Sequence, residues 1–125
     1  MIVVSDTSPL RYLIAIGQID LLRRLFGQIH CPDAVRLEAC HPGAPASLRE
    51  FFTTPPSWLV ILPPSSGHDP TLSVELDPGE AEAIWVAKEM RATLLLMDER
   101  RGRRAATARG LRVAGTLNLL AEASG

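Results

Sequence analysis

Two aspartates follow two apolar runs at matching positions in the chain. Asp6 comes shortly after Ile2-Val3-Val4, and Asp98 comes directly after Leu94-Leu95-Leu96-Met97. Short apolar runs without polar alternation are typical of strands buried on both faces of a parallel sheet. Parallel strands end at one shared edge, where open α/β folds bind their ligands. We therefore expect Asp6 and Asp98 to present two carboxylates at that edge, at a switch point if the two strands are neighbours.

A third acid lies on the helix expected between these two runs. Asp77 is a typical N-cap, Pro78 suits the first helical position, and Glu80 occupies the third. An aspartate at one strand end is most simply the N-cap of the next helix. A core needs no carboxylate there, so two such aspartates, with Glu80 between them, favour a functional site.

Positive charge is concentrated in the second half of the chain, although the net charge is −1. Eight of the thirteen Lys and Arg residues lie within residues 88–112, and twelve of the thirteen are Arg, whose planar fork grips phosphate. Arg100, Arg103 and Arg104 share one side of a helix at i, i+3 and i+4, and Arg101 lies away from them. A solvated helix face explains any single Arg equally well. The arginines of residues 100–104, as a group at the same sheet edge, predict contacts with a nucleic-acid backbone.

Length and composition indicate one globular domain. The chain has 125 residues, of which 46% are hydrophobic and 22% charged, as in ordinary soluble domains. It has no apolar run of the roughly 20 residues that a membrane span needs, and no basic segment typical of a signal peptide opens it. Cys31 and Cys40 form no CxxC motif, which favours a reduced, cytoplasmic protein.

Strand and helix patterns alternate along the chain, which predicts a parallel sheet with right-handed crossovers. For the first helix we expect Ser8 as N-cap and Pro9 at the first helical position, and we expect Gly17, Gly27 and Gly110 to end helices. The expected strands are residues 2–5, 28–31, 58–62, 94–97 and 111–114, and the other expected helices include residues 19–26, 32–40, 45–53 and 116–123.

Five stretches, spread in order from Ile2 to Leu120, resemble PIN-domain nucleases, and most of all the branch grouped with VapC-like toxins of toxin–antitoxin modules. They are IVVSDTSPL, CPDAVRLE, LDPGEAEAIWVA, LLLMDERRGRRAA and RVAGTLNLL. The resemblance implies a three-layer α/β/α sandwich around a central parallel sheet of four to five strands. We expect a single PIN-like domain over residues 1–125, shorter than its relatives by their last C-terminal helical segment. The resemblance further implies a metal-dependent endoribonuclease acting as a toxin, with a small antitoxin protein as partner, a homodimeric assembly and no membrane association.

The resemblance also assigns residues. The four family acids fall on Asp6, Glu38, Glu80 and Asp98. Spacing alone makes Glu38 an exposed helical residue, so only the resemblance places it in the site. The third acid is Glu where many PIN domains have Asp. Auxiliary positions fall on Ser8, Glu82, Glu99 and Thr116, and the family's helix Arg falls on Arg103.

The chemistry of these residues agrees with the resemblance. Hydrolysis of a phosphodiester needs a nucleophilic water and neutralisation of charge on the phosphoryl oxygens, and Mg²⁺ or Mn²⁺ supplies both. These hard ions prefer carboxylate and water oxygens. We expect Asp6 and Asp98 to bind metal directly, and Glu80 and Glu38 to bind a second ion, hold its waters or act as general base.

Three other interpretations stay open at this point. A degenerate PIN-like module could serve as a protein-binding scaffold. A zinc site could form from His30, Cys31, Cys40 and His41, although their spacing matches no common zinc finger. A phosphoaspartate receiver domain needs a lysine at a strand end, and Lys88 lies within a helix. Finally, no aromatic residue lies among the arginines, so base stacking on the protein is not indicated.

Overall fold

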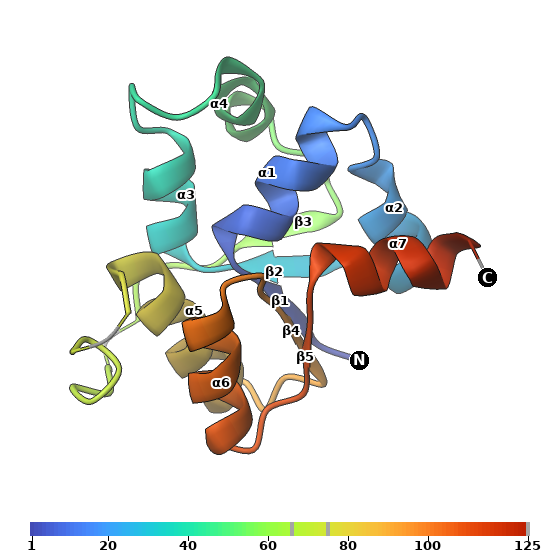
Figure 1. Ribbon diagram of the computed structural model, residues 1–125. Coiled ribbons are helices and arrows are strands. Elements are labelled where there is room, and N and C mark those ends of the chain that lie inside the picture. Colours follow the sequence, from blue (N-terminus) through green and yellow to red (C-terminus); the bar gives the residue numbers. More distant parts are fainter. Residues whose placement is uncertain (66, 75, 125) are drawn as a thin grey trace.

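The computed structural model describes residues 1–65, 67–74 and 76–124. Its centre is a five-stranded parallel sheet with the strand order β3-β2-β1-β4-β5 (Figure 1). The strands are short, and each lies inside a predicted one. Their bounds are β1 Val3–Ser5, β2 Ile29–Cys31, β3 Leu59–Ile61, β4 Leu94–Leu96 and β5 Val113–Ala114.

Helices cover both faces of this sheet, which confirms the predicted three-layer α/β/α fold. Helices α5 and α6 lie on one face, and the remaining helices lie on the other (Figure 1). The bounds are α1 Thr7–Ala15, α2 Asp20–Phe26, α3 Asp33–Ala39, α4 Ala46–Thr53, α5 Pro78–Glu89, α6 Arg100–Ala108 and α7 Thr116–Ser124. Among the described residues, these helices are all too short or too polar to cross a bilayer.

Neighbouring residues of the central strands pack into two separate cores. Val3 and Leu96 belong to the core beneath α1, whereas Val4 and Leu95 belong to the core beneath α5 and α6. All four side chains are fully buried. Successive side chains of a strand point to opposite faces, so a strand between two helical layers must be apolar at every position. This explains the unbroken apolar runs in the sequence.

The strand order reverses between β1 and β4. The chain moves outward from β1 through β2 to β3, and then returns to place β4 on the other side of β1. Ser5 pairs with Leu96, so Asp6 and Asp98 leave neighbouring parallel strands at the same edge. The predicted switch point is therefore confirmed.

One predicted helix start is wrong. Helix α1 begins at Thr7, and its N-cap is Asp6 in place of Ser8. Pro9 is thus the third helical residue. Its missing N–H costs nothing there, because the first four N–H groups of a helix have no partner within the helix. The predicted glycine stops are confirmed: Gly17, Gly27 and Gly110 have φ of +70°, +79° and +83°.

Candidate active site

Asp6 is the most buried acid at the switch-point edge. Only 3% of the residue is exposed, and its Oδ1 atom has no hydrogen-bond partner among the described residues. Burial raises the pKa of Asp6 from 3.8 to about 7, although the backbone N–H of Thr7 opposes the shift. The neighbouring carboxylates of Asp77, Glu38 and Glu80 raise the pKa further. A buried carboxylate oxygen without a partner is costly, and a bound cation would satisfy it.

Glu38 reaches this edge from α3. Although the residue is exposed, its Oε2 accepts a hydrogen bond of 3.0 Å from the hydroxyl of Thr7. Thr7 is buried and follows Asp6 directly, so the first turn of α1 fixes both the first acid and the partner of the second. Thr7 is not among the predicted site residues, because Ser8 was the expected cap of this helix. A prediction of Asp6 as the N-cap would have placed Thr7 in the first turn of α1.

Three carboxylates gather around the first turn of α5. A Cβ atom at Gly79 would lie 2.7 Å from Glu38 Oε2, 3.6 Å from Asp77 Oδ1 and 3.9 Å from Asp6 Oδ1. Gly79 is buried, and its lack of a side chain leaves the room that these oxygens occupy. Asp77, which sequence reasoning treated only as a helix cap, is therefore an additional acid of the site.

Glu80 lies beside these three carboxylates and also caps the start of α5. It forms a capping box with Asp77, the predicted N-cap: the Glu80 N–H donates to Asp77 Oδ1 at 2.8 Å, and the Asp77 N–H donates to Glu80 Oε1 at 3.2 Å. Burial raises the pKa of Glu80 from 4.5 to about 7, and the Asp77 carboxylate adds to the shift. A Cβ at Gly102 would meet Met97 Sδ and lie 3.2 Å from Glu80 Oε2, so Gly102 lets α6 approach this acid.

Asp98 occupies the other flank of the edge, next to α7. Its Oδ1 accepts a bond of 2.6 Å from the Thr116 N–H, and its Oδ2 accepts one of 2.8 Å from the Thr116 hydroxyl. A Cβ at Gly115 would lie 2.8 Å from Asp98 Oδ1 and 2.5 Å from Arg103 Nη1. Asp98 is therefore fixed by the start of α7 and lies close to Arg103.

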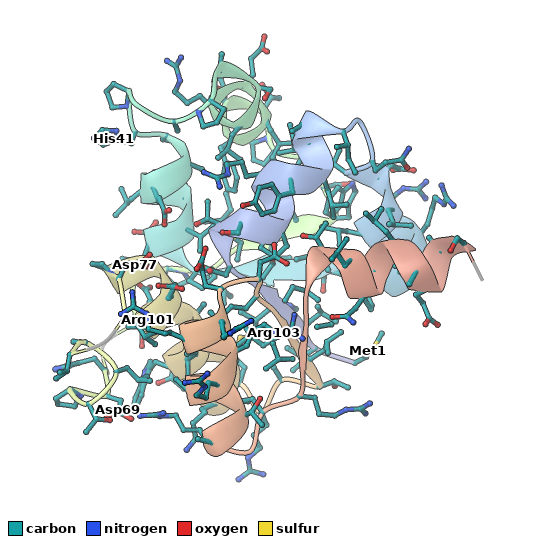
Figure 2. The ribbon with its side chains drawn as sticks, viewed as in Figure 1. Met1, His41, Asp69, Asp77, Arg101 and Arg103 are labelled. Atoms are coloured by element: carbon teal, nitrogen blue, oxygen red, sulfur yellow. The ribbon has the colours of Figure 1, made fainter. Side chains whose placement is uncertain are left out.

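A hollow of about 490 Å³ lies between Asp98 and the arginines of α6. It is lined by Asp98, Arg100, Arg103, Arg104 and Thr107, and we call it the arginine hollow. Arg101 does not line it. Figure 2 shows Arg101 and Arg103 on opposite sides of α6, as helical spacing predicts. Arg103 Nη2 donates to Asn118 Oδ1 at 3.4 Å, and in the described part of the chain no carboxylate lies within 4.0 Å of it.

The other predicted auxiliary residues make no hydrogen bond with the acids of the site in the described part of the chain. Glu82 lines a separate cavity of about 390 Å³ beside Trp85. Burial raises its pKa, and the nearby carboxylate of Asp33 adds to the shift. Glu99 is the exposed N-cap of α6, and no side-chain hydrogen bond caps that helix. Ser8 is half-buried in the first turn of α1.

The alternative zinc site does not form. Over residues 1–65, 67–74 and 76–124, no three His, Cys, Asp or Glu side chains are arranged to hold a metal ion by themselves. Cys31 is buried, which raises the pKa of its thiol, whereas Cys40 is exposed. His41 uses Nδ1 to accept a bond of 2.9 Å from the Gly43 N–H.

The same finding bears on a magnesium or manganese site among the acids. Mg²⁺ keeps several waters and is commonly held by only one or two carboxylates, so it does not need three protein ligands at one point. Asp6 offers an unpartnered buried oxygen, and Gly79 leaves the room in which Glu38 approaches it. The donors are all carboxylate oxygens, which suit a hard divalent ion. These residues therefore fit such an ion.

Comparisons with known proteins agree with this fold. A family model described as a PIN domain matches residues 2–125. No curated protein matches the chain. Among solved structures, the chain is similar to the PilT N-terminus domain protein SSO1118 from the hyperthermophilic archaeon Sulfolobus solfataricus P2. The TM-score is 0.61 at 18% sequence identity, and the match covers 98% of this chain and 92% of that one.

Proposed function

We propose that this chain, which belongs to the PIN-domain family, is a divalent-metal-dependent endoribonuclease. One observation carries the proposal: within the described part of the chain, Asp6 Oδ1 is buried without a partner, beside Glu38 and Asp77, at the edge where the strand order reverses. Evolution of a stable core alone gives no reason to bury such an oxygen. A nuclease does have a reason to bury this oxygen, because Mg²⁺ or Mn²⁺ bound there would activate the attacking water and neutralise charge on the phosphoryl oxygens.

The acids have different roles in this proposal. Asp6, which follows β1, and Glu38 of α3 supply oxygen ligands to the ion, and Asp98, which follows β4, holds one of the waters of the ion. Thr7 and Thr116 hold the Glu38 and Asp98 carboxylates in place through their hydroxyls. Fixed ligands bind more tightly than mobile ones because less conformational entropy is lost on binding.

Glu80 is suited to accept a proton. A general base works best when its pKa lies near the working pH, and burial brings the pKa of Glu80 to about 7. Its Oε1 is held by the Asp77 N–H, which leaves Oε2 to take the proton of the attacking water. Arg100, Arg103 and Arg104 hold the phosphate backbone in the arginine hollow.

The test uses Asp6→Asn and Asp98→Asn, which remove a charge and keep the side-chain size. We expect both variants to remain folded and to cleave RNA more slowly by orders of magnitude, and EDTA to stop the wild type. DNA of the same sequence tests the preference for RNA. Wild-type rates in both variants, or cleavage that survives EDTA, would contradict the proposal.

Metal binding has a readout that does not depend on activity. An ion that binds only the folded state raises its melting temperature. Millimolar Mn²⁺ or Mg²⁺ should therefore stabilise the wild type and do little for Asp6→Asn. Equal shifts in both proteins would exclude Asp6 as a ligand.

We also propose a role as the toxin of a toxin–antitoxin pair, with a small antitoxin protein as partner and a homodimeric assembly. The support is the resemblance of the sequence motifs to VapC-like toxins. A small neighbouring gene that encodes a DNA-binding protein, and whose product relieves growth arrest by this chain, would support the role. Sedimentation of the purified protein tests the dimer. Growth that is unaffected by expression of the chain would contradict the toxin role.

A further inference from the structure

We infer that a groove between α1 and α7 binds an unpaired nucleobase of the RNA strand whose phosphate lies in the arginine hollow. The inference rests on the proposed function and names the substrate more closely, as a single-stranded or bulged nucleotide. The groove measures about 500 Å³. It is lined by Tyr12 and Ile16 of α1, by Leu117 and Leu120 of α7, and by Asp98 and Arg103. We call it the α1–α7 groove.

The groove gathers apolar side chains that the fold leaves in solvent. Tyr12 is 43% exposed, Ile16 is 53% exposed and Leu117 is 82% exposed. Only three other large apolar side chains of the described residues are as open, and none of them lines this groove. Exposed apolar residues scattered singly need no explanation, but a gathered set marks a binding surface.

The occupant is indicated by what the groove shares with its neighbour. Asp98 and Arg103 line both the α1–α7 groove and the arginine hollow, so the two spaces meet at these side chains. A base is joined through one sugar to its own phosphate. A strand with a phosphate at Arg103 therefore brings a base to the apolar side of that residue. A wholly apolar helix of a partner protein would leave the Arg103 guanidinium and the Asp98 carboxylate without polar partners, which is costly.

Tyr12 supplies the ring on which a base could stack. The Arg11 guanidinium carbon lies 5.0 Å from the centroid of that ring, and Arg11 Nη2 lies 3.3 Å from the tyrosine hydroxyl. This contact steadies the ring and adds positive charge at the rim. Aromatic side chains bind unstacked bases of RNA in this way, and duplex bases are not available to them. The lack of an aromatic residue near the arginines in sequence was misleading, because Tyr12 comes from a distant helix.

The test measures RNA binding on the Asp6→Asn background, where cleavage is prevented and the groove is intact. The probes are a short single-stranded oligoribonucleotide containing 2-aminopurine and a duplex of the same sequence. We expect Tyr12→Leu to weaken binding of the single strand about tenfold and to abolish the quenching of 2-aminopurine. Tyr12→Phe keeps the ring and should bind like the parent. Duplex binding should not change.

Leu117 has a matched control in Val74, which is 83% exposed and lies outside the groove. We expect Leu117→Ala to weaken single-strand binding several-fold and Val74→Ala to leave it unchanged. Equal binding of the single strand by Tyr12→Leu and its parent would overturn the inference. So would a change in the oligomeric state of Leu117→Ala, because the groove would then be a protein interface.

The outcomes separate this inference from the proposed function. If the wild type cleaves RNA, Asp6→Asn does not, and Tyr12→Leu cleaves and binds like the wild type, the nuclease stands and the groove assignment falls. If neither probe binds and no RNA is cleaved, both fall together.

Discussion

Thr116 holds both oxygens of Asp98, one through its backbone N–H and the other through its hydroxyl. The start of α7 thereby fixes a carboxylate that leaves the end of β4. Thr116→Val should remove the hydroxyl bond and keep the shape. We expect a loss of about 1 kcal/mol in the free energy of unfolding and about tenfold slower RNA cleavage, because Asp98 becomes free to turn away.

Urea unfolding and cleavage rates measure the two effects. Thr116→Ser keeps the hydroxyl, so it should retain most of the activity. If Thr116→Val cleaves as fast as Thr116→Ser, the hydroxyl does not position Asp98.

Substitution of Gly79 should change the rate of RNA cleavage but not the stability of the protein. Gly79→Ala puts a Cβ 2.7 Å from Glu38 Oε2, so the flexible Glu38 side chain must move and lose its bond from Thr7. The replacement also favours the helix by up to about 1 kcal/mol, which offsets the lost bond. We expect a nearly unchanged free energy of unfolding and at least tenfold slower cleavage.

A second substitution sharpens this prediction. Glu38→Asp shortens the side chain by one methylene and makes room for the new methyl group. The double variant Gly79→Ala, Glu38→Asp should therefore cleave faster than Gly79→Ala alone. A double variant that is no faster would show that crowding of Glu38 is not the cause.

The pKa shifts of Asp6 and Glu80 predict how stability depends on pH without metal. Burial raises the pKa of both carboxyls to about 7 in the folded protein, so between about pH 4 and 7 the folded state holds more protons than the unfolded state. These two carboxyls therefore destabilise the folded protein increasingly as pH rises through this range. For Asp6 the cost above pH 7 is up to roughly 4 kcal/mol, because each pKa unit corresponds to 1.36 kcal/mol.

Asp6→Asn should remove that cost. In EDTA, we expect the variant to be more stable than the wild type at pH 8 and similar at pH 4, as measured by urea unfolding at each pH. Glu89→Gln, at an exposed carboxyl on α5, should show no such difference. A wild type whose stability rises between pH 4 and 7 as steeply as that of Asp6→Asn would rule out the buried Asp6 charge as a destabilising group.

The sequence predicted more of the fold than of the site. Unbroken apolar runs identified β1 and β4 because burial on both faces leaves no other pattern, and the Asp77 cap followed by Pro78 identified the start of α5. The site depends on contacts between distant segments, which spacing does not encode. The bond from Thr7 to Glu38 and the groove that Tyr12 shares with Arg103 were missed for this reason. Asp77 was recognised as a cap, but only the approach of α3 shows that it also faces Glu38 and Asp6.

The arginines of α6 give the last prediction. With a net charge of −1, affinity for RNA must come from local positive charge, and the arginine hollow is where Asp98 meets such charge. Arg103 lines the hollow on the side of α7, whereas Arg101 projects from the opposite side of α6 (Figure 2). Each phosphate contact that is lost should flatten the log–log salt dependence of single-strand binding by about 0.7. On the Asp6→Asn background, Arg103→Ala should therefore flatten the slope and Arg101→Ala should not. The opposite result, measured by titration at several salt concentrations, would place the RNA on the side of α6 that carries Arg101.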